Sequence, residues 1–182
     1  MSQPDDSIPI GIVRTGQIIT GALIMSVVIF TLVVLLAIPP AAPPPGPAPD
    51  QTLSLMAGMA FLASVPLSFI MPRFATRSAL AKIAAGTWQP PRSDDPRVKP
   101  EQFASTTGKL LAVWQTSLII GLAMLEGCAF LALIAFMIED QPAVLVVAGI
   151  AIALMLVRFP AMSRVEAWVE DQAGMLAEMT RV

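Results

Sequence analysis

Hydrophobic residues gather into four long runs that are nearly free of charge. At 1.5 Å per residue, a helix needs about 20 apolar residues to cross a bilayer. The first run is longer than the core of a cleaved signal and has two aspartates against one arginine before it, so it is predicted to be a retained span. The predicted spans are residues 18–38, 53–71, 110–138 and 143–158.

Polar or proline-rich segments separate these runs and complete the predicted organisation. Pro66 lies inside the second run and is expected to kink it or to free a carbonyl group. Apolar residues recur at helical intervals after Met162, which predicts a C-terminal amphipathic helix lying on the membrane or on the central loop. The segments are a cytoplasmic N-terminal segment (1–17), a Pro-rich external loop (39–52), a basic cytoplasmic loop with an amphipathic start (72–109), an external turn (139–142) and a cytoplasmic amphipathic tail (159–182).

The distribution of basic residues predicts the orientation of the chain. All 11 lysines and arginines lie in residues 1–17, 72–109 and 158–182, and none lies in the other two connecting segments. Cytoplasmic segments of membrane proteins are enriched in Lys and Arg. Both termini and the central loop are therefore predicted to be cytoplasmic, in a multi-pass protein of the cytoplasmic (inner) membrane. The basic residues of 73–82 also suit binding to anionic lipid, although this general charge bias explains them equally well.

Composition agrees with this all-α, polytopic fold class of four transmembrane helices and a C-terminal amphipathic helix. The chain is 55% hydrophobic and 13% charged, whereas soluble domains carry about 25% charged residues. It has no histidine and a single cysteine, and we find no phosphate-binding loop or nucleophile motif in it. We therefore expect no enzymatic activity, no cofactor and no metal site. The net charge of −2 gives no reason to expect nucleic acid as a partner.

Glu126 is the one charged residue inside the first three runs. An ionised acid at the centre of a membrane helix costs on the order of 2.5–3.5 kcal/mol, and a lipid environment favours its neutral form. No lysine or arginine lies at similar depth, so the candidate hydrogen-bond partners are the hydroxyl groups of Ser26, Thr31 and Ser64. Three interpretations stay open: a neutral acid that fixes helix packing, a proton or cation site, and a salt bridge to another subunit.

The sequence around Glu126 resembles that of a known ion-carrying helix. Residues 115–138, "QTSLIIGLAMLEGCAFLALIAFMI", resemble the carboxylate-bearing helix of the rotary ATPase c-subunit proteolipids. This resemblance implies that Glu126 carries an ion. The first helix of that family has alternating glycines, whereas residues 53–71 contain only Gly58. In layout, the whole chain resembles small uncharacterised four-span bacterial membrane proteins, which implies the fold and no activity.

Two functions of different classes follow from these observations. The first is a structural or accessory subunit of a membrane assembly, and the alternative is an ion-translocating, proteolipid-like component that uses Glu126 as its protonatable carrier. Polar residues near Glu126 lie on its cytoplasmic side only, at 115–117, which favours the first. The expected partners are the lipid bilayer and either further copies of the chain or other membrane subunits. Ala123 and Gly127 form a small-xxx-small pair that lets another helix approach closely.

Overall fold

The computed structural model describes residues 10–37, 51–90 and 103–181, and this part of the chain contains helices and no strands. The predicted segments that fall outside these ranges, including most of the Pro-rich loop, are not described. The five helices are α1 (Ile10–Ala37), α2 (Thr52–Ala84), α3 (Thr106–Glu139), α4 (Ala143–Val157) and α5 (Met162–Met179).

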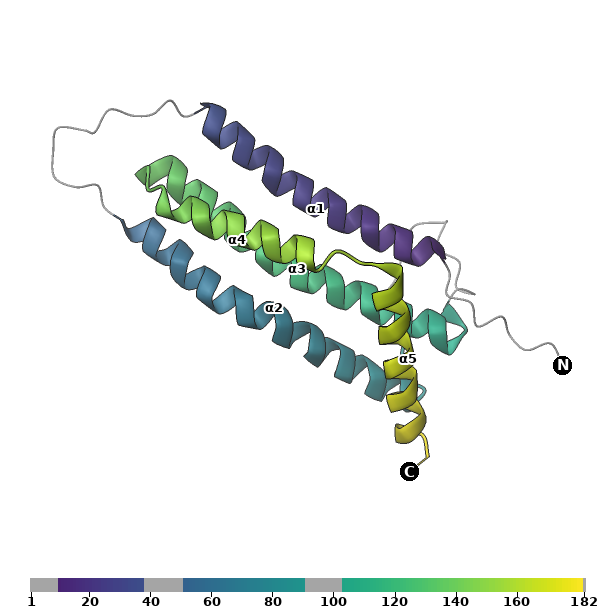
Figure 1. Ribbon diagram of the computed structural model, residues 1–182. Coiled ribbons are helices and arrows are strands. Elements are labelled where there is room, and N and C mark those ends of the chain that lie inside the picture. Colours follow the sequence, from purple (N-terminus) through teal and green to yellow (C-terminus); the bar gives the residue numbers. More distant parts are fainter. Residues whose placement is uncertain (1–9, 38–50, 91–102, 182) are drawn as a thin grey trace, which may run out of the picture.

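The first four helices lie side by side, and α5 turns across one end of the bundle (Figure 1). α1 and α3 run in one direction, while α2 and α4 run in the other. α3 is the central helix, because it contacts each of the other four. The start of α1, the end of α2 and the start of α3 therefore lie at the same end as α5.

The structure confirms an all-α protein whose helices suit a membrane. Three helices are long and apolar enough to cross one: Gly11–Leu36, Thr52–Ala84 and Thr106–Glu139. α4 has 15 residues, or about 22 Å of helix, which is less than the roughly 30 Å of a hydrocarbon core. It reaches the length of a span only together with α5, from which it is bent by 70°.

Two helices extend much further than the apolar runs predict. α1 begins at Ile10, within the predicted cytoplasmic N-terminal segment (1–17). α2 continues through Pro66 and Pro72 to Ala84, within the predicted cytoplasmic loop (72–109). The residues after Pro72, predicted as the amphipathic start of the cytoplasmic loop, continue the second helix. The extension has its own apolar core, formed by Val13, Leu80, Leu110, Leu111, Trp114, Val165 and Val169.

The C-terminal helix packs on the start of the segment predicted as the central loop, which is helical, and on the neighbouring end of α3. Val165, Val169 and Leu176 of α5 are buried, and α5 contacts α3 and α2. Of the two surfaces expected for this apolar edge, the one observed is the central segment, which continues α2 as a helix to Ala84, together with the start of α3. α5 lies across these ends as a cover (Figure 1).

Local sequence signals explain where α2 ends and where α3 begins. Gly86 has a φ of 67°, and Gly86 and Thr87 donate backbone N–H bonds to Ile83 and Lys82, which closes α2 with a left-handed glycine. The hydroxyl oxygen of Ser105 accepts the N–H of Gly108 at 3.0 Å and so caps the start of α3.

Candidate functional site

Glu126 and Ser26 meet at the interface between α3 and α1. The Oγ atom of Ser26 lies 2.6 Å from Oε1 of Glu126 and 2.7 Å from the carbonyl oxygen of Leu23 in its own helix. Both Ser26 and Glu126 are partly buried. The hydroxyl group has one hydrogen, so it donates to one of these two oxygens at a time.

An aromatic pair follows the Ser26–Glu126 pair by one helical turn. Phe30 and Phe130 pack edge to face, with ring centroids 5.3 Å apart. Each ring lies four residues beyond its polar neighbour on the same helix, and because α1 and α3 run in parallel, the two contacts stack along one interface. This interface consequently combines a polar contact and an aromatic contact between the same two helices.

The other predicted partners of Glu126 do not bond to it. The Thr31 hydroxyl group donates to the carbonyl oxygen of Val27 at 2.8 Å, within its own helix. Ser64 makes no hydrogen bond to Glu126 in the described part of the chain. Cys128 is buried, with its Sγ atom 3.0 Å from the carbonyl oxygen of Leu125.

The small-residue pair beside Glu126 points away from the bundle. Ala123 and Gly127 are both exposed, and a Cβ atom added at Gly127 would meet nothing within 4 Å. No described helix of this chain therefore uses the close approach that the pair permits.

Glu139 is a second buried carboxylate, which the sequence analysis placed in an external turn without a role. It is the last residue of α3, yet it accepts the backbone N–H groups of Leu53 at 2.6 Å and of Ser54 at 2.8 Å. These groups belong to the first turn of α2, whose N-cap residue, Gln51, makes no side-chain cap bond. Glu139 thus caps α2 from a neighbouring helix. The position of Glu139 was the sequence signal that could have indicated this role. An acid at the C-terminus of its own helix is unfavourable there, because it opposes the helix dipole.

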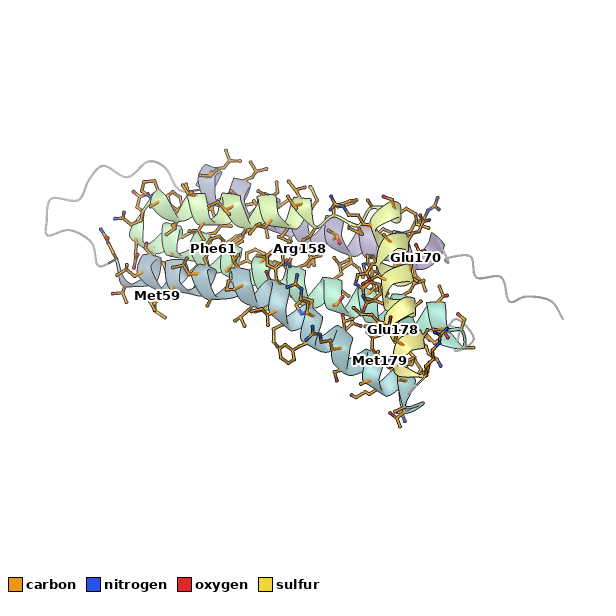
Figure 2. The ribbon with its side chains drawn as sticks, turned by 60° about the horizontal axis from the view of Figure 1, so that its bottom comes forward. Met59, Phe61, Arg158, Glu170, Glu178 and Met179 are labelled. Carbon is orange, nitrogen blue, oxygen red and sulfur yellow. The ribbon has the colours of Figure 1, made fainter. Side chains whose placement is uncertain are left out.

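Arg158, which sequence analysis treated only as the boundary of the fourth run, packs into the bundle where α4 ends. Its guanidinium carbon lies 4.0 Å from the centroid of the Phe69 ring on α2, and Figure 2 shows the residue beside the α4–α5 bend. Gly121 of α3 leaves the space for it, because a Cβ atom there would be 2.6 Å from the Arg158 guanidinium and 3.1 Å from the carbonyl oxygen of Ser68. Pro72 has no N–H to donate to that carbonyl group.

This packing predicts opposite effects for two glycine substitutions. Gly121→Ala should lower the free energy of unfolding by about 1–2 kcal/mol, because the added methyl group must displace Arg158 and press on Ser68. Gly127→Ala should be neutral or stabilising by up to about 1 kcal/mol, because it adds helix propensity in open space. Far-UV circular dichroism during denaturation in mixed micelles compares the two, and equal stabilities would contradict the close contact.

No group of three or more His, Cys, Asp or Glu side chains that could hold a metal ion occurs among the described residues. No protein-family model, curated protein sequence or solved structure matches the chain. Its function is therefore inferred from its own residues.

Proposed function

We propose that the chain is a multi-pass protein of the cytoplasmic membrane that serves as a structural or accessory subunit of a membrane assembly, without a catalytic site. It crosses the membrane four times, with α1 to α4, and both termini are cytoplasmic. The Ser26–Glu126 pair fixes α1 against α3 within this bundle.

The dimensions of α3 support this placement. Glu139 and Gly121 are 18 positions apart, which corresponds to about 27 Å of helix and is close to the thickness of a hydrocarbon core. With Glu139 at the external surface, Gly121 and Arg158 lie at the cytoplasmic boundary. The C-terminal end of α2 and the N-terminal end of α3 then project into the cytoplasm with α5. α4, about 22 Å long, covers most of the thickness, with residues 140–142 at the external surface and Arg158 at the cytoplasmic boundary.

The hydrogen-bond geometry of Ser26 carries the functional proposal. An ionised Glu126 and the Leu23 carbonyl group would compete for one hydroxyl hydrogen. A neutral Glu126 donates its own hydrogen to Ser26, which then donates to Leu23, so that each of the two hydroxyl hydrogens has its own acceptor. At this level in α3, inside the hydrocarbon, the neutral form also avoids the cost of a buried charge. Glu126 is therefore engaged inside the chain as a packing acid.

Purification with partners tests the assignment as a subunit. The tagged full chain, extracted from its native membrane in a mild detergent, should elute with other membrane proteins in fixed proportion. A chain that elutes without other proteins, and with the mass of one copy, would contradict the proposal.

The orientation makes a separate prediction. Single cysteines introduced in a Cys128→Ser background at Ala48 and at Gln141 should react with a membrane-impermeant maleimide added to intact cells. A cysteine at Ser93 should react only after the cells are opened. Labelling of the Ser93 position from outside would reverse the assignment of the central segment.

One observation favours the ion-translocating alternative. Glu126 is only partly buried, and the exposed Ala123 and Gly127 beside it would let a helix of a second copy come close. In that arrangement an ion site would form between copies, with Glu126 in the role of ion carrier that the resemblance to the rotary proteolipids implies. Flux through vesicles separates this function from the first.

A further inference from the structure

Three arginines surround a groove between α2, α3 and α5, close to the α4–α5 bend. Two adjoining cavities of about 260 and 360 Å³ share Pro72, Arg73, Ser117 and Trp168 in their walls. Arg158 lines the first cavity, while Arg77 lines the second. We call this feature the arginine groove and define it by Arg73, Thr76, Arg77, Arg158 and Trp168.

The charge of the arginine groove is not neutralised by the described part of the chain. None of its three arginines forms an ion pair there. Asp171, the one acid in the groove walls, accepts a hydrogen bond from the side-chain amide of Gln172 at 2.7 Å. The groove therefore has an excess of positive charge that suits an anion.

Thr76 supplies a second, independent indication of a ligand. Its side chain is only 8% exposed and lines the larger cavity. Its hydroxyl group makes no hydrogen bond within the part of the chain that the structure describes. Because Thr76 lines the cavity and its hydroxyl oxygen is not among the fully buried unpaired atoms, the hydroxyl group is accessible to a ligand oxygen in the groove.

The groove also continues into an apolar surface. Phe69, Ile70 and Met71 precede Arg73 on α2 and are each exposed by 44% or more. In the membrane placement proposed above from the length of α3, Gly121 and Arg158 lie at the cytoplasmic boundary of the hydrocarbon. Tryptophan side chains such as Trp168 are favourable at this interface. A ligand with an anionic head and apolar chains would match both surfaces at once, whereas free phosphate would match only the first.

We propose that the arginine groove binds the phosphate of an anionic phospholipid of the cytoplasmic leaflet. The planar guanidinium groups of Arg73, Arg77 and Arg158 donate to the phosphate oxygens, and the Thr76 hydroxyl group donates one further bond. The acyl chains lie along the exposed apolar residues of α2. This site is separate from Glu126 and holds whether or not that residue carries an ion.

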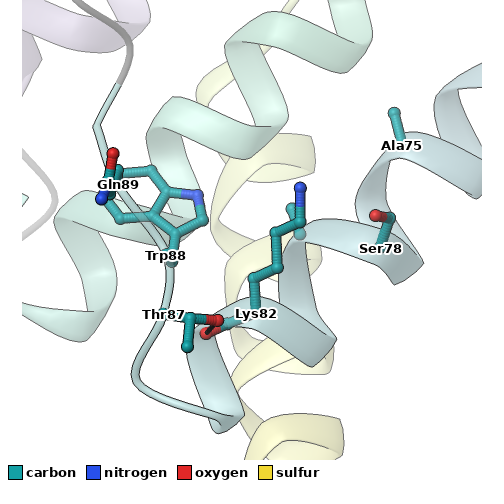
Figure 3. A pocket seen from close by; sticks show the side chains of 7 residues that line it. Ala75, Ser78, Lys82, Thr87, Trp88 and Gln89 are labelled. Atoms are coloured by element: carbon teal, nitrogen blue, oxygen red, sulfur yellow. Dashed lines mark hydrogen bonds between the residues drawn. The ribbon is translucent and has the colours of Figure 1, made fainter.

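Another cavity on α2, of about 520 Å³, is a weaker candidate. Figure 3 shows Lys82 and Trp88 in its wall, near the end of α2. It offers one cation, Lys82, which lies 11 positions beyond Met71, the last residue of the exposed apolar run at 69–71, and is therefore farther from the lipid. The arginine groove is therefore the better site for a lipid headgroup.

Native mass spectrometry of the full chain in an uncharged detergent tests the proposal. Dioleoyl phosphatidylglycerol should bind about tenfold or more tightly than dioleoyl phosphatidylcholine, because several arginines act on one phosphate. The variant Arg73→Gln/Arg77→Gln should lose about tenfold of its affinity for the anionic lipid. Both residues are exposed, so this variant is expected to fold. Arg158→Gln, compared at equal helicity, provides a second test.

The charge-matched control is Arg14→Gln/Arg181→Gln, which removes two exposed arginines outside the groove. It should keep the affinity of the wild type. Equal losses in the control and groove variants would overturn the proposal, and so would equal binding of the two lipids. Displacement of the lipid by millimolar inorganic phosphate would instead identify a site for soluble anions and would also contradict a lipid site.

Discussion

Replacing Glu139 with alanine is expected to lower the free energy of unfolding by about 3 kcal/mol. The substitution removes two short hydrogen bonds to the backbone N–H groups of Leu53 and Ser54. Bonds to a charged group contribute about 1.5–3 kcal/mol each, and the carboxylate also offsets the positive end of the α2 dipole. Without it, α2 loses both its cap and its attachment to the end of α3. Denaturation in mixed micelles, followed by far-UV circular dichroism, measures the loss.

Asp140→Asn is the matched control, because it removes the adjacent exposed carboxylate and leaves an asparagine that tolerates the φ of 50° at this position. It should change stability by less than about 0.5 kcal/mol. Glu139→Gln keeps one acceptor and should lose about half as much as Glu139→Ala. If Glu139→Ala and Asp140→Asn are equally stable, Glu139 does not cap α2.

The second large effect is expected at Glu126. Glu126→Leu should cost about 1–2 kcal/mol, because an interhelical hydrogen bond in a membrane is lost. Glu126→Gln should stay within about 0.5 kcal/mol of the wild type, because its amide can donate to Ser26 as the neutral acid does. A double-mutant cycle with Ser26→Ala should give a coupling energy of about 0.6–1.7 kcal/mol for Glu126→Leu.

Thr31→Val provides the control for this cycle. The Thr31 hydroxyl group bonds within its own helix, so its removal should show no coupling to Glu126→Leu. A coupling of the same size at Thr31 and Ser26 would mean that α1 responds as a whole and that the pair is not specific.

The helical membrane class was predictable because it depends on run length, whereas the extent of the helices was not. The apolar runs were sufficient to locate the parts of α1, α2 and α3 that suit a bilayer. Proline at position 72, followed by arginines, is typical of a helix that ends, yet α2 continues because Leu80 joins a core with Leu110 and Val165. Such a core depends on tertiary contacts, and no local pattern reveals it.

The candidate site was predictable only in part, because its contacts also depend on how the helices pack against one another. Glu126 was conspicuous as a charge in an apolar run, but three hydroxyl groups were at similar depth, and only the register of α1 against α3 distinguishes Ser26. Glu139 was overlooked because an acid beside a turn is ordinary in sequence. Its role arises from the antiparallel neighbour, whose first N–H groups lie within reach.

Ion flux through the purified protein tests the central claim that Glu126 is a packing acid. Wild type and Glu126→Gln are reconstituted at equal density into sealed vesicles, and proton and sodium uptake are followed under an imposed potential. We predict that neither protein carries ions faster than empty vesicles, because Glu126 is engaged by Ser26 inside the chain. Uptake by the wild type that disappears in Glu126→Gln, with the fold intact, would contradict this claim and assign Glu126 as an ion carrier.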